Sequence, residues 1–342
     1  MKPYPLFAAA CCVALVVVTV LPFLVRSYTV FQLTLTMAYA IAILGLNLLT
    51  GFSKQISLGH GAFFAVGAYT AAVLLDKSSC PYWLTLPAAA MLCFVFGLLI
   101  GFPALRLGGH NLALATFALA FATPQLLKHP RVEALTGGVQ GLNLTKPQAP
   151  FEFQLFGQEL NADRWLYFVA LIVAVLVFAM AWNLLRGRIG RALVAIGDHP
   201  VAASAMGINI TVFKTIVFGI SAGLTGLAGA LSAIAVAFVS PDSFSVALSI
   251  ILLVGLVVGG LASLPGAIFG AAFIQFLPNI ADQISKSAPA AIYGLVLVLL
   301  MWLLPGGVMG GLSAVSARLR RQRVRGRNSQ VKLPTGEFRR GV

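Results

Sequence analysis

Long apolar runs separated by short polar segments fill most of this 342-residue chain. Each run is close to the length of roughly 20 residues that an α-helix needs to cross a bilayer. The runs are continuous and do not alternate apolar with polar residues, as the strands of a membrane barrel would. The pattern predicts ten membrane-spanning helices, over residues 5–25, 29–50, 57–75, 82–102, 110–127, 164–185, 214–237, 245–262, 265–281 and 289–304.

The composition favours the same interpretation. Apolar residues make up 59% of the chain and charged residues 9%, whereas an ordinary soluble domain has about 25% charged residues. These values exclude a soluble enzyme, a disordered chain and a fibrous protein. We therefore expect an all-α polytopic membrane protein, with a transmembrane domain over residues 1–304 and a basic, disordered cytoplasmic tail over residues 305–342.

The distribution of charge predicts the orientation in the membrane. The tail 305–342 has nine basic residues and one acid, Glu337, and Lys and Arg are retained on the cytoplasmic side. Ten spans then place both termini inside, together with the basic segment 186–213 and the turn that contains Lys54, and place the long loop 128–163 outside. Topology and contact of the tail with anionic lipid account for the net charge of +14 without nucleic acid.

The sequence disfavours an ion pump and contains no motif of an enzyme. None of its nine acidic residues falls inside a long apolar run, whereas a buried ionisable group usually marks a proton or ion pathway. There is no phosphate-binding loop of the type that ends in Gly-Lys, and the four histidines form no metal-binding cluster. We expect no catalytic site, no metal and no cofactor in this chain, although a uniporter remains open.

Small residues recur at helical spacing in the apolar runs. Gly219, Gly223, Gly226 and Gly229 fall on one face of a helix, which favours close packing of helix backbones within lipid. In addition, segments 57–64 and 263–269 are alike apart from one gap. Such a pair is typical of a repeated transporter core, but chance similarity between glycine-rich helices explains it equally well.

Segment 186–213 is too long for a tight turn and begins with basic residues. Pro200 suits the first turn of a short helix, with Asp198 or His199 near its cap, and Gly207 suits its end. Two interpretations are open: an interfacial helix that lies on lipid, or a docking helix for another protein.

Two sets of residues carry a resemblance to known families. The first set resembles the coupling loop of ATP-binding-cassette (ABC) importer permeases, and consists of Arg191-Ala192-Leu193, Ala202-Ala203-x-x-x-Gly207-Ile208-Asn209 and Lys214. The second set is similar to the branched-chain amino-acid permeases, especially their LivM-type subunit, and consists of Thr50-Gly51, Gln55-Ile56-Ser57-Leu58-Gly59-His60-Gly61-Ala62-Phe63-Phe64, Gly67-Ala68-Tyr69-Thr70 and Thr136-Gly137-Gly138. The resemblance spans roughly residues 40–305.

The resemblance implies a fold of the type II ABC importer permeases, in the inner membrane of a bacterium. It implies four partner subunits: a second, homologous permease subunit, two cytoplasmic ATPase subunits that use the ATP, and a periplasmic substrate-binding protein. The chain departs from the family at Val201, where an acid is usual, and at Ser204, where relatives often have a carboxylate. The substrate stays open between branched-chain amino acids and related amino acids, amides or urea.

The resemblance also suggests functional residues. The expected ATPase coupling loop contains Arg191, Asp198, Ala202, Ala203, Gly207 and Lys214. The expected substrate pathway contains Gly59, His60, Gly61, Thr116, Thr136, Gly137 and Gly138. The alternative for His60 is a packed, hydrogen-bonded core residue, and the alternative for Thr116 is a bond to its own helix carbonyl. The alternative function for the whole chain is a stand-alone secondary carrier or channel; a scaffold or enzyme is the least favoured.

Overall fold

The computed structural model describes residues 18–78, 80–105, 109–151, 153–155, 158–284, 286 and 288–314. Most of the first predicted span, 5–25, therefore lies outside the described residues, although residues 18–24 are helical. The predicted tail 305–342 is described only as far as residue 314.

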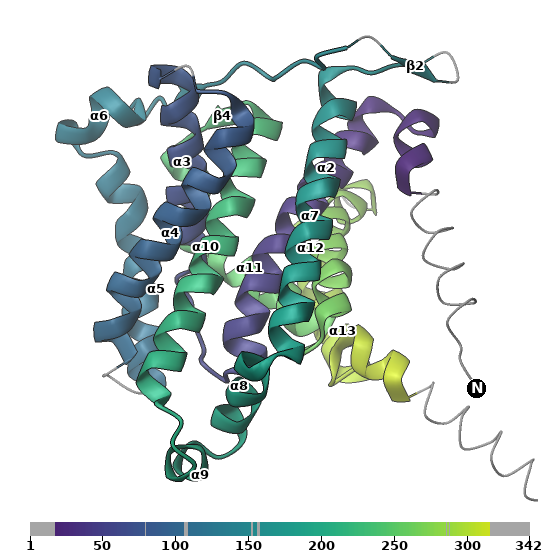
Figure 1. The fold of residues 1–342 in the computed structure, drawn as a ribbon. Helices are drawn as coiled ribbons and strands as arrows, with labels where there is room; N and C mark the ends of the chain where they lie inside the picture. Colours follow the sequence, from purple (N-terminus) through teal and green to yellow (C-terminus); the bar gives the residue numbers. More distant parts are fainter. Residues whose placement is uncertain are drawn as a thin grey trace, which may run out of the picture.

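A helix coincides with each of the predicted spans that follow the first one (Figure 1). The long helices are α2 (Ser27–Leu46), which continues as the π-helix η1 (Asn47–Phe52), α3 (His60–Ser78), α4 (Tyr82–Leu105), α5 (Gly109–Leu127), α7 (Ala162–Arg186), α10 (Ile210–Val236), α11 (Val246–Gly259), α12 (Leu264–Ile284) and α13 (Pro289–Leu303). Among the described residues, six helices are long and apolar enough to cross a membrane. A polytopic helical membrane protein is thus confirmed, and the count of ten spans with both termini cytoplasmic stays a prediction.

The short elements gather at the two ends of the helix bundle (Figure 1). One end carries α8 (Arg188–Asp198) and α9 (Pro200–Ala205), and we call it the α9 end. The opposite end, which we call the β4 end, carries α6 (Pro130–Thr136), β1 (Leu142–Asn143), β2 (Gln154–Leu155), β3 (Gln158–Glu159), β4 (Phe238–Val239) and the 3₁₀-helix η2 (Pro241–Phe244). The antiparallel pair β1–β4 joins the loop 128–163 to the segment that follows α10.

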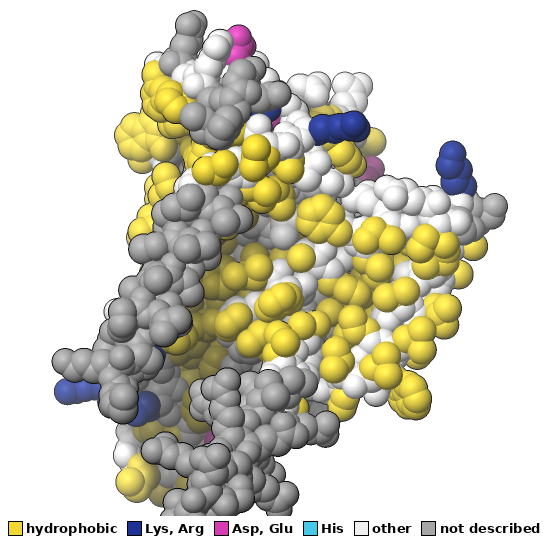
Figure 2. All heavy atoms as spheres, turned by 90° about the vertical axis from the view of Figure 1, so that its right-hand side faces the viewer, with side chains coloured by type: hydrophobic (Ala, Val, Ile, Leu, Met, Phe, Trp, Pro, Cys, Tyr) yellow, Lys and Arg dark blue, Asp and Glu magenta, His cyan; other side chains and the backbone are white. Residues whose placement is uncertain are grey.

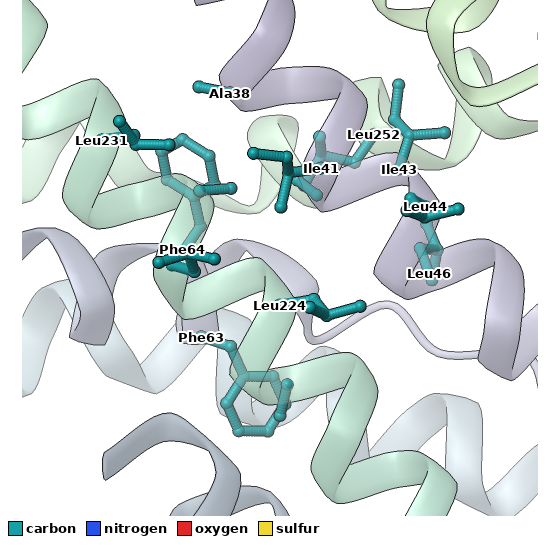
Figure 3. Close-up of a cluster of buried hydrophobic side chains, with 14 of the residues drawn as sticks. Ala38, Ile41, Ile43, Leu44, Leu46, Phe63, Phe64, Leu224, Leu231 and Leu252 are labelled. Carbon is teal, nitrogen blue, oxygen red and sulfur yellow. The ribbon is translucent and has the colours of Figure 1, made fainter. Parts of the chain in front are cut away.

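The core surrounds α10, which packs against α2, α3 and α4. Side chains of Ile41, Phe63, Phe64 and Leu224 meet in this core (Figure 3). The predicted glycine stripe on α10 serves the close packing: a methyl group added at Gly229 would clash with the backbone at Phe64. Close backbone approach through glycine is the usual way in which membrane helices associate, so the packing interpretation of this stripe is confirmed.

The outer helices expose apolar side chains. Leu176 and Met180 on α7, and Val298 and Trp302 on α13, are largely exposed. Figure 2 shows a broad hydrophobic surface on the side that carries α13 in Figure 1, with the visible charged side chains at its margins. Apolar surface of this extent is expected of a protein that faces lipid or a partner subunit.

Candidate functional site

A non-helical break separates η1 from α3 inside the helix bundle. Residues 53–59 form neither helix nor strand, and Ser53, Gln55, Ser57 and Gly59 are buried. Irregular backbone within a membrane protein is tolerated only where other protein groups or a water-filled cavity satisfy its polar atoms. The hydrogen bonds of this break therefore decide how it is held.

Side chains from two other helices bind the backbone at the end of the break and at the start of α3. The Leu58 N–H donates to Thr116 Oγ1 of α5 over 3.0 Å, and the Gly61 N–H donates to Ser249 Oγ of α11 over 2.8 Å. There is no room for a larger residue at Gly59, because an added Cβ would lie 2.9 Å from the Thr116 carbonyl oxygen. Helices α5 and α11 thus hold the start of α3 in place.

His60, the first residue of α3, is fully buried and bonded through both ring nitrogens. Its Nε2 lies 2.7 Å from Ser221 Oγ on α10, and its Nδ1 lies 3.1 Å from Ser57 Oγ. The Ser221 hydroxyl donates to the Gly45 carbonyl of α2 over 2.6 Å. Because a hydroxyl has one proton to donate, Nε2 is the donor to Ser221 and Nδ1 the acceptor. His60 therefore links α2, α3 and α10, as a packed, hydrogen-bonded histidine would.

Thr116 makes the bond to its own helix carbonyl that was the alternative to a pathway role, and it also contacts the break. It is fully buried. Its Oγ1 donates to the carbonyl of Ala113, in its own helix, over 3.0 Å and accepts from Leu58 in the break. Four of the predicted pathway residues, Gly59, His60, Gly61 and Thr116, thus meet in one cluster, which we call the break cluster.

The other three predicted pathway residues lie at the β4 end (Figure 1). Thr136 Oγ1 donates to the Leu127 carbonyl over 2.8 Å and accepts from the Gly138 N–H over 3.3 Å. Gly137 caps α6 in the left-handed conformation, with φ of 71°, which favours glycine. Thr136, Gly137 and Gly138 therefore form the turn that ends α6 and do not join the break cluster.

The structure confirms the predicted short helix in segment 186–213. Pro200 is the first residue of α9. The helix ends in a Schellman motif, in which the Ile208 N–H donates to the Ala203 carbonyl over 3.1 Å and the Gly207 N–H to the Ser204 carbonyl over 3.0 Å. Gly207 has φ of 82°, and such a motif favours glycine at that position.

The surface of α9 faces outward, and α8 packs inward. Val201 is 81% exposed and Met206 84% exposed, whereas Ala203 is 4% exposed. On α8, Leu193 and Ile196 are buried. The remaining predicted coupling residues are exposed or half-buried, and these are Arg191, Asp198, Ala202, Gly207 and Lys214. In Figure 1, α9 protrudes from its end of the bundle, so α9 is accessible to another protein.

An ion pair joins α8 to the beginning of the break. Lys54 Nζ lies 2.8 Å from Asp198 Oδ1. The hydrogen bond from Lys54, together with its charge, holds the pKa of the Asp198 carboxyl below its usual value, so the pair is charged at neutral pH. Next to it, a Cβ added at Gly197 would lie 2.7 Å from the Phe52 carbonyl oxygen. The predicted coupling segment is therefore in direct contact with the chain that leads to His60.

Sequence reasoning missed the partners of these residues. Ser221 and Ser249 hold the break but were not singled out, and Ser57 was named only within the motif of the resemblance. A hydroxyl residue inside an apolar run is a signal for an interhelical hydrogen bond, and this signal could have identified Ser221 and Ser249. The pairing of Lys54 with Asp198 had no sequence signal beyond their predicted location on the same side of the membrane.

The two similar segments occupy equivalent places in their helices. Segment 57–64 leads into α3 and segment 263–269 into α12, each after a non-helical stretch. Asn47 of η1 binds the second stretch, since its side chain donates to the Ser263 carbonyl over 2.7 Å and accepts from the Ala262 N–H over 2.9 Å. A repeated core would place the two segments in this way.

Apolar helices that could span a membrane, a bonded break inside the bundle and a protruding helix at one end define a polytopic membrane transport subunit. The chain belongs to the family described as the permease component of branched-chain amino acid transport systems, whose model matches residues 28–305. It is therefore a permease of an ABC importer, a class that works with ATPase and binding-protein partners.

Individual relatives agree with this assignment. The high-affinity branched-chain amino acid transport system permease protein LivM of Escherichia coli K12 is 35% identical over 309 residues, which cover 85% of this chain and 72% of LivM. The autoinducer 2 import system permease protein LsrC of Escherichia coli O9:H4 is 30% identical, over 75% of this chain and 73% of LsrC. The ribose import permease protein RbsC of Haemophilus influenzae is 29% identical over 42% of this chain and 46% of RbsC. No solved structure matches the chain.

Proposed function

We propose that this chain carries branched-chain amino acids across the inner membrane of a bacterium, as one half of a permease pair. The observation that supports this most strongly is the family match over residues 28–305, together with the similarity to LivM. The other half is a second, homologous permease. Two cytoplasmic ATPase subunits bind and hydrolyse the ATP, and a periplasmic binding protein delivers the substrate to loop 128–163. The chain itself needs no cofactor and catalyses no reaction.

In this proposal α9 docks on the ATPase. Its exposed apolar residues, Val201 and Met206, supply the contact surface, since removal of apolar surface from water drives most protein–protein association. Ala203 packs inward and acts by holding α9 on the bundle. Gly207 acts by ending the helix. Arg191, Asp198, Ala202 and Lys214 complete the coupling segment.

Movement of the ATPases then reaches the break cluster through two contacts. The Lys54–Asp198 ion pair and the close approach of Gly197 to Phe52 connect α8 to the residues just before the break. A shift of α8 and α9 therefore acts directly on residues 53–59. In our proposal this shift separates α3 from Thr116 and Ser249 and opens a path beside Gly59, His60 and Gly61.

The test is substrate uptake by purified proteins in liposomes. The complete assembly, with ATP on the ATPase side and the binding protein on the other, is expected to accumulate leucine, isoleucine and valine. The chain alone, or the assembly without ATP, is expected to accumulate none. Uptake by the chain alone under an ion gradient would instead establish the stand-alone carrier. A second measurement decides the substrate class: urea and acetamide are tested for their ability to displace leucine from the binding protein.

A further inference from the structure

An apolar groove lies between α5 and the start of α11. It has a volume of about 510 Å³, within the range of roughly 300–1,000 Å³ that is usual for small-molecule sites. Phe117, Ala120 and Phe121 line it from α5, and Val246 and Ala247 line it from α11. The chemistry of this wall suits a small apolar side chain.

A cation and an anion stand together on the lining of the groove. Lys128, just after α5, forms an ion pair with Asp242 of η2, and both residues line the groove. Their side chains remain 25% and 67% exposed. An exposed ion pair contributes little stability, so both groups are available to exchange this contact for a ligand.

The inner wall of the groove adjoins the residues that hold the break cluster. Phe117 lines the groove, while its neighbour Thr116 binds the break from the same helix. On α11, Ala247 lines the groove, and Ser249 binds Gly61. A ligand in the groove therefore contacts the same two helices, α5 and α11, that bind the break cluster.

We propose that this groove binds the substrate as a free α-amino acid with an uncharged, apolar side chain. The α-carboxylate pairs with Lys128, the α-ammonium group pairs with Asp242, and the side chain lies along Phe117, Ala120 and Phe121. The inference rests on the proposed function and deepens it, because it assigns residues to the two charges that every α-amino acid carries. Urea and simple amides lack these charges and gain nothing from the pair.

The test is a double-mutant cycle in the complete importer, reconstituted in liposomes with ATP and a saturating amount of leucine-loaded binding protein. Lys128→Met and Asp242→Asn each remove one charge with little change in size. Each is expected to reduce the leucine uptake rate about tenfold, the usual loss for a charged contact. The double variant is expected to reduce it about a hundredfold, because the two groups bind different ends of the substrate.

Three results overturn the inference. If the two residues serve only to bind each other, the double variant falls no further than either single variant. If lipid fills the groove, uptake in the single variants equals that of the wild type. If the groove is instead the interface with the second permease, the variants lose that subunit during purification. Co-purification of all subunits and ATPase activity stimulated by the binding protein are therefore measured on every variant.

The matched control is the ion pair between Asp76 and Lys77 near the end of α3; neither residue lines the groove, and both lie outside loop 128–163. The double substitution Asp76→Asn with Lys77→Met is expected to leave uptake within about twofold of the wild type, as an exposed pair contributes little.

Uptake by the wild-type importer distinguishes a failure of this inference from a failure of the proposed function. If it does not transport leucine at all, the proposed function fails; if it does and both single variants transport normally, only the groove assignment fails.

Discussion

The break at residues 53–59 and the helix α9 both interrupt the long helices, but they are built in opposite ways. Ser53, Gln55, Ser57 and Gly59 of the break are buried. The bonds of this region run to distant elements: Leu58 binds Thr116 of α5, and the break leads into His60, which binds Ser221 of α10. Helix α9 is closed by bonds within its own segment and exposes Val201 and Met206. The chain itself fixes the geometry of the break, whereas α9 offers a free surface. Substitutions at the break should therefore destabilise the fold, whereas substitutions on the surface of α9 should weaken the binding of the ATPase.

The largest effect is expected at Gly59. Gly59→Ala adds a Cβ that lies 2.9 Å from the Thr116 carbonyl oxygen and 3.0 Å from Thr116 Cβ. Overpacking of this kind costs about 1–3 kcal/mol. We expect a lower thermal unfolding midpoint of the purified subunit and the loss of uptake. Gly294→Ala is the matched control, since an added Cβ at Gly294 meets nothing within 4 Å. Equal behaviour of the two variants would contradict the close contact at the break.

The next effect is expected on α9 and should leave the fold intact. Val201→Glu places a charge on a side chain that is 81% exposed. A desolvated charge at an apolar interface is costly, so we expect the ATPase subunits to be lost on co-purification, while the thermal midpoint of the permease is unchanged. In contrast, Ala203→Asp buries its charge within the chain, because Ala203 is 4% exposed. It should lower both the thermal midpoint of the permease and the recovery of the ATPases. Normal recovery of the ATPases with Val201→Glu would argue strongly against docking at α9.

A smaller effect is expected at His60. His60→Ala removes the bonds to Ser57 and Ser221. Each hydroxyl keeps another partner, since Ser221 still binds the Gly45 carbonyl and Ser57 still accepts from the Gly59 N–H, so each lost bond costs about 0.5–1.5 kcal/mol. Ser221→Ala removes the bond to His60 from the other side and serves as the comparison. If His60 acts only in packing, uptake falls in both variants only as far as their stability falls. If His60→Ala changes neither uptake nor ATPase stimulation, a pathway role for His60 is excluded.

The smallest effect is expected at the ion pair that joins the two regions. Lys54→Met or Asp198→Asn removes the contact between α8 and the break, and because the pair is exposed we expect only about a twofold fall in leucine transported per ATP hydrolysed. The exchanged double variant, Lys54→Asp with Asp198→Lys, is expected to recover most of the loss. No change in the single variants would contradict a role of this ion pair in coupling.

Much of the fold could be predicted from the sequence, because lipid imposes a strong rule on helix length and polarity. The apolar runs gave helix positions within a few residues, and the spacing of glycines on α10 gave its packing face. Pro200 and Gly207 marked α9 because their backbone preferences are local. The predicted start of α3 at residue 57 was wrong by three residues, since the break continues to Gly59.

The site was harder to predict because its contacts join distant residues. His60 and Ser221 are 161 positions apart, and Lys54 and Asp198 are 144 positions apart. A single sequence contains no information on which polar residue meets which. Lys128 and Asp242 were not identified as a pair, since their pairing depends on how η2 packs beside α5.

The central claim, that movement of α9 opens the break cluster, can be tested by the reactivity of one cysteine. Thr116→Cys is introduced into a chain whose four native cysteines are serine, and the complete importer is treated with a membrane-permeant maleimide. Thr116 is fully buried here, so we predict slow labelling without nucleotide and fast labelling when the ATPases are trapped with ATP and vanadate. With Val201→Glu added, labelling should stay slow in both conditions. The same labelling rate in every state would contradict the account.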